Sequence, residues 1–268
     1  MRSSGTRCVS FFLLAFGITW GLQLPGVLAQ RGMLPGDPKV YLPFVALGAL
    51  GPLIAATLLS FREQGMTAVK RLYSPLLHWR VHFGWYVAAL PLPGVLLTGL
   101  LWLLNQGGRI GPIAYVPAAG GVIFGLVMSL VEEVGWRGYA LPRLAARWGP
   151  YGAGALIGGL WYLWHIPMFL GAGVPLDLAP VMLLYFVGAS LFLTGMYSGT
   201  KGSLLLAVLA HLGAHLDNSH RALPTDVAPL IAHAIIYSAL GLFVMRRFAH
   251  SNRHRPTAQP LSNWETHG

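Results

Sequence analysis

Two adjacent acidic residues, Glu132 and Glu133, follow one of the most apolar stretches of this sequence, residues 122–131. The chain contains only 8 acidic residues among its 268. A carboxylate at membrane depth costs at least a few kcal/mol unless it is paired, so it is by default a candidate functional group. Arg137 comes four positions after Glu133, on the same helix face and within ion-pair range. For Glu133 alone, a structural ion pair explains the residue equally well. One arginine cannot neutralise two adjacent carboxylates, however, which leaves one glutamate for chemistry.

Three histidines lie in other apolar runs, and their types fit the same chemistry. They are His165, His211 and His215, and the last two share a helix face through their i, i+4 spacing. A glutamate near histidines can act as a general base toward water, and imidazoles can orient that water or stabilise an oxyanion. The same set could bind a divalent metal such as zinc, although the Glu of an H-E-x-x-H motif is missing because Leu212 follows His211. The implied reaction is hydrolysis by an activated water, with or without a metal.

The spacing of these residues along the chain predicts that they meet in space. Between the glutamates and His165, the turn signal is Gly149-Pro150, which lies 16 residues after Glu133 and 16 residues before His165. A helical hairpin at this turn would place Glu133 and His165 at the same level. The next apolar stretch begins near Lys201-Gly202, so the two later histidines lie roughly 15–20 Å into it at 1.5 Å per residue. We therefore expect one layer of Glu and His side chains that opens to the cytoplasmic side.

The composition predicts a membrane protein made of helices. Hydrophobic residues make up 55% of the chain and charged residues 10%, with a mean hydropathy of +0.59. Soluble domains carry roughly 25% charged residues, so this surface is too apolar for water. We predict an all-α fold, a polytopic membrane bundle of about eight transmembrane helices in one domain over residues 1–248, followed by a flexible cytosolic tail over 249–268. The expected spans are 9–29, 40–60, 83–104, 117–148, 152–170, 178–199, 202–219 and 227–248.

The distribution of charge predicts the orientation of the chain in the membrane. The net charge is +10, and 14 of the 18 Lys and Arg residues lie in segments on the side of the two termini. The loops expected on the opposite side contain only Arg31, Lys39, Arg109 and Arg221. This asymmetry follows the positive-inside rule and predicts a multi-pass protein of the cell membrane with both termini in the cytoplasm. The basic residues are thus assigned to topology and to contact with lipid headgroups, and no nucleic-acid partner is expected.

Two features near the N-terminus bear on processing and on cysteine chemistry. The first apolar run could also be a signal peptide cleaved near Val27-Leu28-Ala29, which would leave the remaining topology unchanged. The single cysteine, Cys8, excludes an internal disulfide framework and a cysteine metal cluster.

Three short motifs combine the candidate residues. They read Glu132-Glu133-x-x-x-Arg137, Trp161-x-x-x-His165 and His211-x-x-x-His215. Together they resemble the CAAX prenyl protease and bacteriocin-processing (Abi) family of intramembrane proteases. The resemblance covers roughly residues 117–220, and a layout of eight helices fits it.

This resemblance implies an enzyme, a hydrolase of the intramembrane endopeptidase type, with its catalytic core in residues 117–220. Carried over by position, Glu132 looks like the catalytic base and Glu133 like its neighbouring carboxylate. Arg137 looks like the structural partner of the pair. His165 and His211 look like the residues that orient water and stabilise the transition state. Members of the family are called metalloproteases in places, but a Glu and His site also suits a mechanism without metal.

The sequence departs from the family pattern at two positions. Trp161 stands where Phe is usual, which is a mild exchange of one aromatic residue for another. His215 stands where Asn is usual. Asn offers a neutral amide donor to an oxyanion, whereas His can donate but also titrates. The second exchange therefore affects the expected oxyanion contact and leaves metal binding open.

The substrate is less defined than the reaction. Prenylated CAAX peptides are the family's eukaryotic substrate class, and bacteriocin leaders or other membrane-anchored peptides are alternatives. The expected partners are thus membrane lipid and a peptide or lipidated-peptide substrate. A proton-coupled transporter is an alternative function because intramembrane Glu and His also build proton relays, although inverted repeats with paired broken helices are not evident. A non-catalytic immunity or scaffold protein with the same fold is a further alternative.

Overall fold

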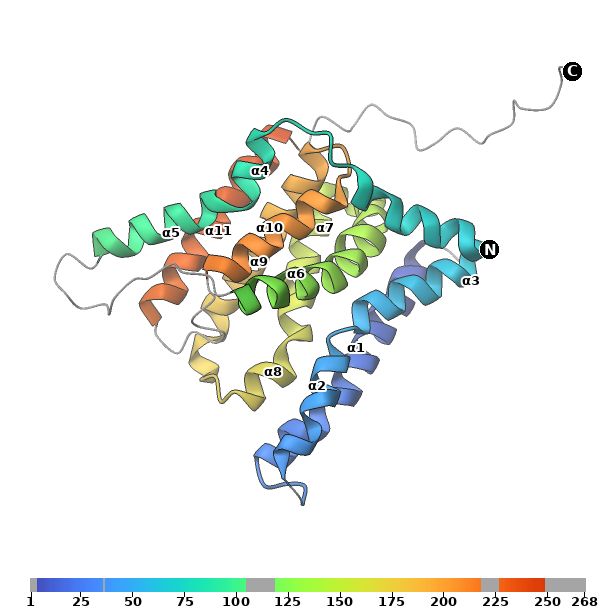
Figure 1. The fold of residues 1–268 in the computed structure, drawn as a ribbon, viewed down its shortest axis with the longest axis vertical. Helices are drawn as coiled ribbons and strands as arrows, with labels where there is room; N and C mark the ends of the chain where they lie inside the picture. Colours follow the sequence, from blue (N-terminus) through green and yellow to red (C-terminus); the bar gives the residue numbers. More distant parts are fainter. Residues whose placement is uncertain (1–3, 36, 105–118, 218–226, 249–268) are drawn as a thin grey trace, which may run out of the picture.

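The computed structural model describes residues 4–35, 37–104, 119–217 and 227–248, and every regular element in these ranges is a helix (Figure 1). The prediction of an all-α fold is therefore confirmed. The expected cytosolic tail, 249–268, lies outside the described residues.

The helices divide into longer α-helices and short segments with other helical hydrogen bonding. The α-helices are α1 (Ser4–Gln30), α2 (Leu42–Gly48), α3 (Gly51–Tyr73), α4 (Gly84–Ala89), α5 (Pro91–Leu104), α6 (Ala119–Glu133), α7 (Leu141–Trp164), α8 (Ile166–Gly171), α9 (Ala179–Gly199), α10 (Leu204–Asp217) and α11 (Val227–Phe248). The short segments are the 3₁₀ turns η1 (Pro38–Tyr41), η2 (Ser74–Leu77) and η4 (Leu176–Leu178), and the π-helix η3 (Val134–Ala140).

Several helices are long and apolar enough to cross a membrane. Among the described residues there are 4 such stretches, or 5 if the bent pair over Pro38–Leu77 counts as one span. Large apolar side chains such as Leu13, Ile123 and Phe243 are 65–69% exposed, as expected for surfaces that face lipid. These features support a multi-pass membrane protein.

The expected number of eight spans is not confirmed, and breaks in the helices explain the difference. The spans predicted at 117–148 and 152–170 fall in one continuous stretch, Gly120–Gly171, and those predicted at 83–104 and 202–219 yield the shorter apolar helices Pro91–Leu103 and Leu204–Leu216. Pro91 begins α5 directly after α4, and a proline without an N–H group cannot continue the preceding helix. Hydropathy registers apolar length but not such interruptions.

Helix α9 lies at the centre of the bundle and packs against α7, α10 and α11. Small residues permit this close packing. A Cβ atom on Gly158 of α7 would lie only 2.6 Å from the Cα of Val187 in α9. A Cβ atom on Gly188 of α9 would lie 2.7 Å from the backbone nitrogen of Ser238 in α11. The three helices therefore approach each other at backbone distance, as is common where glycine lines an interface between membrane helices.

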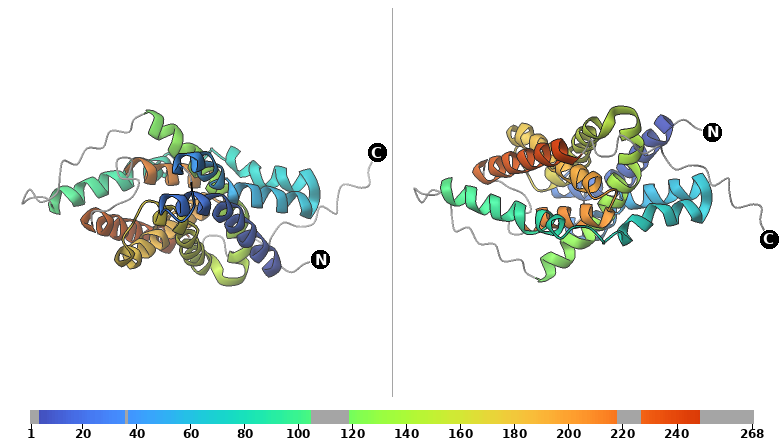
Figure 2. Two further views of the ribbon diagram at one scale, coloured as in Figure 1. Left: turned by 90° about the horizontal axis from the view of Figure 1, so that it is seen from below. Right: turned by 90° about the horizontal axis from the view of Figure 1, so that it is seen from above.

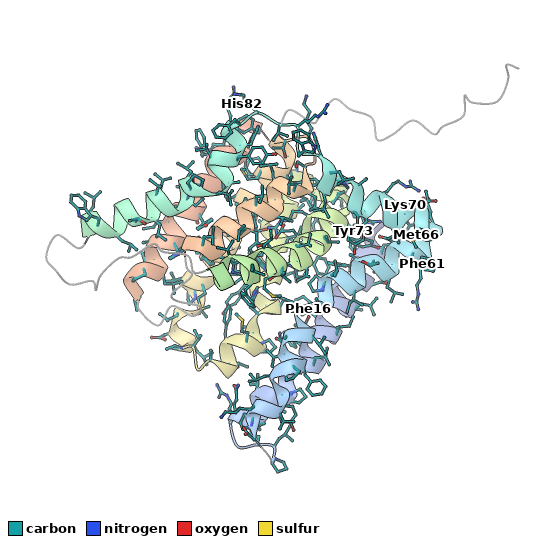
Figure 3. The ribbon with its side chains drawn as sticks, in the orientation of Figure 1. Phe16, Phe61, Met66, Lys70, Tyr73 and His82 are labelled. Atoms are coloured by element: carbon teal, nitrogen blue, oxygen red, sulfur yellow. The ribbon has the colours of Figure 1, made fainter. Side chains whose placement is uncertain are left out.

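Two arms project from opposite sides of this bundle, α3 and α5 (Figures 1 and 2). The chain turns sharply within α3, where Gly65 has a φ of +61°, a conformation that favours glycine. Phe61, Met66 and Lys70 lie at the outer end of this turn (Figure 3). The hydroxyl groups of Thr57, before the turn, and Tyr73, after it, lie 2.7 Å apart and hydrogen-bond the two halves of α3 to each other.

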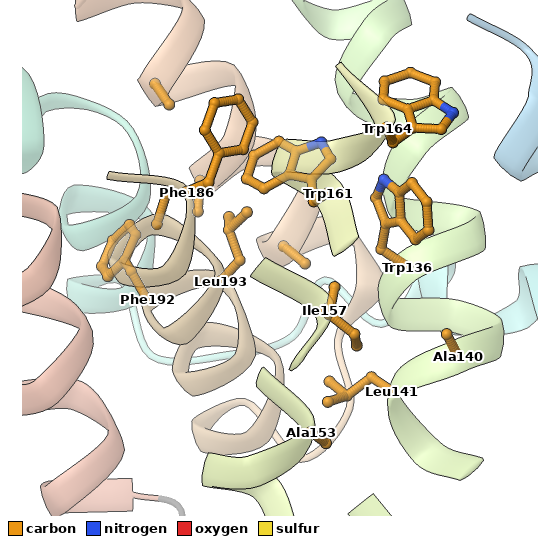
Figure 4. Close-up of a cluster of buried hydrophobic side chains, with 14 of the residues drawn as sticks. Trp136, Ala140, Leu141, Ala153, Ile157, Trp161, Trp164, Phe186, Phe192 and Leu193 are labelled. Carbon is orange, nitrogen blue, oxygen red and sulfur yellow. The ribbon is translucent and has the colours of Figure 1, made fainter. Parts of the chain in front are cut away.

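An aromatic cluster fills the core between η3, α7 and α9 (Figure 4). Trp161 meets Phe186 of α9 edge to face, with 4.8 Å between ring centroids. Trp136 of η3 meets Trp164 in the same way at 5.9 Å. This cluster directly adjoins the glutamates, because Glu133 is the residue before η3.

Candidate active site

The glutamate motif lies where α6 ends and the π-helix η3 begins. Glu132 and Glu133 are the last two residues of α6, and Arg137 is in the middle of η3. π-Helical turns are rare and occur frequently at functional sites, where they re-aim side chains. The local backbone therefore directs the three motif side chains into the protein, where all of them are buried: Glu132 is 4% exposed, and Glu133 and Arg137 are 0% exposed.

One carboxylate oxygen of Glu133 is bonded by both the Arg137 guanidinium and the His211 imidazole. Arg137 Nη1 donates to Glu133 Oε1 at 2.9 Å, so the predicted i, i+4 ion pair is present. His211 Nδ1 of α10 lies 2.9 Å from the same oxygen. The guanidinium also donates through Nη2 to Ser190 Oγ of α9 at 3.0 Å. A buried ion pair of this kind needs further hydrogen bonds to offset the loss of water. Ser190 and His211 supply such bonds here, while Glu133 Oε2 and Arg137 Nε are buried without a hydrogen-bond partner.

Glu132 has a different partner. The indole Nε1 of Trp161 donates to Glu132 Oε2 at 2.5 Å, across 29 residues of sequence. The contact is made because the chain turns back at Gly149, where φ is +66° and the helical conformation is interrupted. The predicted turn at Gly149-Pro150 is thus present, and it brings Trp161 and the adjoining His165 to the level of the glutamates.

Two of the three histidines contact the same tryptophan, and the third stacks on one of them. The Trp161 ring meets His211 edge to face at 5.0 Å between centroids and His165 at 5.7 Å. His211 and His215 stack on one face of α10, at 4.9 Å with 10° between their planes. His165 Nδ1 lies 2.8 Å from the carbonyl oxygen of Trp161. The structure therefore brings all six predicted residues into one cluster: Glu132, Glu133, Arg137 and His211, which are buried, and His165 and His215, which are partly buried.

Two contributions to this cluster were not expected from the sequence. The Trp161 indole was expected to be a mild replacement for Phe, yet it donates a hydrogen bond that Phe cannot make. Ser190 links Arg137 to the carbonyl oxygen of Gly154, to which its Oγ donates at 2.7 Å. The hydroxyl residues Ser190, Thr194 and Ser198 interrupt the apolar sequence of α9, but nothing in the sequence distinguishes Ser190 from the other two.

The positions of the donor atoms bear on whether the site could hold a metal ion. Within the described parts of the chain, no group of three or more His, Cys, Asp or Glu side chains is placed to hold one ion. Glu133 Oε1 is occupied by Arg137 and His211, and His165 Nδ1 faces a backbone carbonyl. In the described residues these side chains thus do not converge on one position that could hold an ion.

The fold and the site define a class of protein: a helical membrane protein with a largely buried cluster of two glutamates, an arginine and three histidines. Comparison with known proteins agrees with this class. The family model described as Type II CAAX prenyl endopeptidase Rce1-like matches residues 114–216. The chain is also similar to "CAAX prenyl protease 2" of Methanococcus maripaludis, with 25% identity over 253 residues that cover 84% of this chain and 92% of the relative.

These two matches confirm the resemblance to the CAAX prenyl protease family that the three motifs indicated. They support a peptidase that works in the membrane. The three motifs all lie within the matched segment.

Proposed function

We propose that this protein is an intramembrane endopeptidase of the CAAX prenyl protease type that hydrolyses a peptide bond with a water activated by glutamate. The observation that carries the proposal is the different pairing of the two carboxylates. Glu133 is neutralised by Arg137, whereas Glu132 is held by a neutral indole donor. Glu132 is thus the carboxylate without a fixed counter-charge, which suits a group that must accept and release a proton.

In this mechanism Glu132 removes a proton from a water molecule as the water oxygen attacks the scissile carbonyl carbon. The resulting tetrahedral intermediate carries its negative charge on the former carbonyl oxygen. Glu132 then passes the proton to the leaving amine as the carbon–nitrogen bond breaks. Arg137 and Glu133 take no proton, and their role is to maintain the electrostatic surroundings of the base.

The hydrogen bonds of the histidines suggest separate tasks. The partners of His165 Nδ1 and His211 Nδ1 are a carbonyl and a carboxylate, which accept hydrogen bonds, so Nδ1 carries the proton in each ring. Their Nε2 atoms are then acceptors that can orient the attacking water. His215 Nε2 is buried without a hydrogen-bond partner. We assign to it the donation of a hydrogen bond to the oxyanion, in place of the amide of the usual Asn.

The substrate class follows from the relative and from the setting. The Methanococcus relative is named a CAAX prenyl protease, and a prenylated peptide is a substrate that a membrane-embedded site could reach through the bilayer. We extend this class to the present chain, with the site open to the cytoplasmic side and both termini in the cytoplasm. In the same proposal the catalytic core is residues 117–220 of a single domain over residues 1–248.

The test is cleavage of a farnesylated peptide with a C-terminal CAAX sequence by the protein purified in detergent. We expect Glu132→Ala, His165→Ala and His211→Ala to abolish cleavage while the variants still insert into the membrane. Glu63→Gln is the matched control, because Glu63 is also partly buried and bonded, to Tyr139 and Arg143, but lies outside the cluster. Full cleavage by Glu132→Ala would overturn the mechanism. Equal cleavage of the unprenylated peptide would overturn the substrate class.

A further inference from the structure

Trp161 contacts four of the six residues of the candidate active site, Glu132, Arg137, His165 and His211. Its indole N–H donates to Glu132, and its ring lies under the Arg137 guanidinium, with 5.5 Å between Cζ and the ring centroid. The same ring meets His165 and His211 edge to face. Trp161 itself is 3% exposed.

The orientation of this indole is fixed by its surroundings. Phe186 of α9 packs edge to face against the ring at 4.8 Å. The helix that carries Trp161 is pressed against α9 at Gly158, one turn earlier, where no side chain separates the backbones. Because the ring cannot turn without displacing α9, its N–H group is pre-aimed at the glutamate. A pre-aimed donor needs no reorganisation at the moment of reaction.

We propose that Trp161 is a positioning residue for the base: its indole N–H holds Oε2 of Glu132 and leaves the second carboxylate oxygen to take the proton from water. This inference rests on the proposed function, in which Glu132 is the base. It also explains what the Phe-to-Trp departure does in this chain. Phe keeps the ring contacts with the arginine and the histidines but has no N–H group, so only the hold on Glu132 would be lost.

The experiment compares Trp161→Phe with a matched control, Trp20→Phe. Trp20 also donates from Nε1, to the carbonyl oxygen of Trp164 at 3.1 Å, but touches none of the six site residues. We expect Trp161→Phe to lower kcat about 10- to 100-fold with KM within about twofold, because a hydrogen bond to a charged group is lost while substrate contacts remain. Trp20→Phe should keep the wild-type kcat.

A spectroscopic measurement tests the hydrogen bond without any activity. In protein labelled with ¹⁵N-tryptophan, the indole N–H resonance that is missing from Trp161→Phe should move in Glu132→Ala and stay in place in Glu63→Gln. If Trp161→Phe does not fold, a second variant with 3-benzothienylalanine at position 161 is used instead. This isostere of tryptophan has sulfur in place of N–H. It should lower kcat to the same extent.

The outcomes separate this inference from the proposed function. The positioning role is overturned if Trp161→Phe or the benzothienylalanine protein keeps the wild-type kcat. It is also overturned if the indole resonance does not move in Glu132→Ala. Neither result contradicts the proposed protease function. An equal loss of kcat in Trp20→Phe also overturns it, because the effect is then not specific to Glu132. Cleavage that survives Glu132→Ala overturns the proposed function instead, and the resonance still decides whether the two side chains are bonded.

Discussion

Arg137 Nη1 and Glu133 Oε1 lie 2.9 Å apart, and both side chains are fully buried. Arg137 reaches back from η3 to the end of α6, and Ser190 and His211 add hydrogen bonds to the pair from two other helices. It therefore joins α6, η3, α9 and α10 at one point. The stability of the fold and the geometry of the site depend on the same contact.

Removing one member of this pair should be more damaging than removing both. Arg137→Met leaves the Glu133 carboxylate buried and unpaired, which we expect to lower the free energy of unfolding by about 3–5 kcal/mol. Arg137→Met combined with Glu133→Gln should recover part of that loss. Thermal unfolding in detergent measures both variants. A double variant less stable than Arg137→Met would contradict the assigned pairing.

Ser190→Ala should weaken the support of Arg137. The change removes the side-chain acceptor for Arg137 Nη2, leaving the more distant Ser190 carbonyl oxygen, and it removes the hydroxyl that donates to Gly154. We expect a loss of about 1–3 kcal/mol in stability together with reduced cleavage. Ser129→Ala is the control. Ser129 is equally buried but donates only within its own helix, to Gly125, so its removal should be close to neutral. Equal effects of the two substitutions would refute the role of Ser190.

Two neighbouring glycines of α7 should respond differently to alanine. A Cβ atom at Gly158 would lie 2.6 Å from Val187 Cα, whereas one at Gly159 would meet nothing within 4 Å. We expect Gly158→Ala to lower stability by about 1–3 kcal/mol, because α7 and α9 must move apart. Gly159→Ala should unfold at the wild-type temperature or above it. Thermal unfolding of both proteins decides, and a tolerant Gly158 would mean that the interface is looser than described.

Substitutions of His215 test its assigned donation to the oxyanion. Asn supplies an amide N–H, so His215→Asn should keep kcat within about tenfold of the wild type, whereas His215→Ala should lower kcat by about 10²–10³-fold. Both values come from steady-state cleavage of the same farnesylated peptide. If His215→Asn is as inactive as His215→Ala, the imidazole acts in some way other than as a hydrogen-bond donor.

The arrangement of donors predicts how the enzyme responds to chelators. Since no three His, Cys, Asp or Glu side chains of the described residues converge on one position, we expect cleavage to persist in EDTA and purified protein to contain zinc well below one ion per chain. Elemental analysis and parallel assays with and without chelator test this. Loss of cleavage in EDTA that zinc restores would show that the residues rearrange around a metal.

The sequence by itself determined the helical membrane class of this protein and the local contacts of its candidate site. Apolar composition determined the helical membrane class, because a chain with so few charges cannot present a water-solvated surface. Local spacing determined the Arg137–Glu133 pair, since residues four apart on a helix are neighbours. The conformation of Gly149 determined the hairpin that brings Trp161 and His165 back to the glutamates, because glycine readily adopts a positive φ. Each of these features depends on composition or on residues close together in the chain, so it can be predicted from the sequence.

The tertiary structure decided which partner each carboxylate receives. The contacts of Trp161 with Glu132 and of Ser190 with Arg137 span 29 and 53 residues, and they depend on how each helix is rotated about its axis. The breaks that shorten several expected spans, such as the one before Pro91, likewise change direction without changing hydropathy. Periodicity and apolar length do not encode helix rotation, because rotation is set by the packing of side chains from helices far apart in the sequence. The two adjacent glutamates therefore look equivalent in the sequence, and only the packed bundle gives one of them a cation and the other an indole.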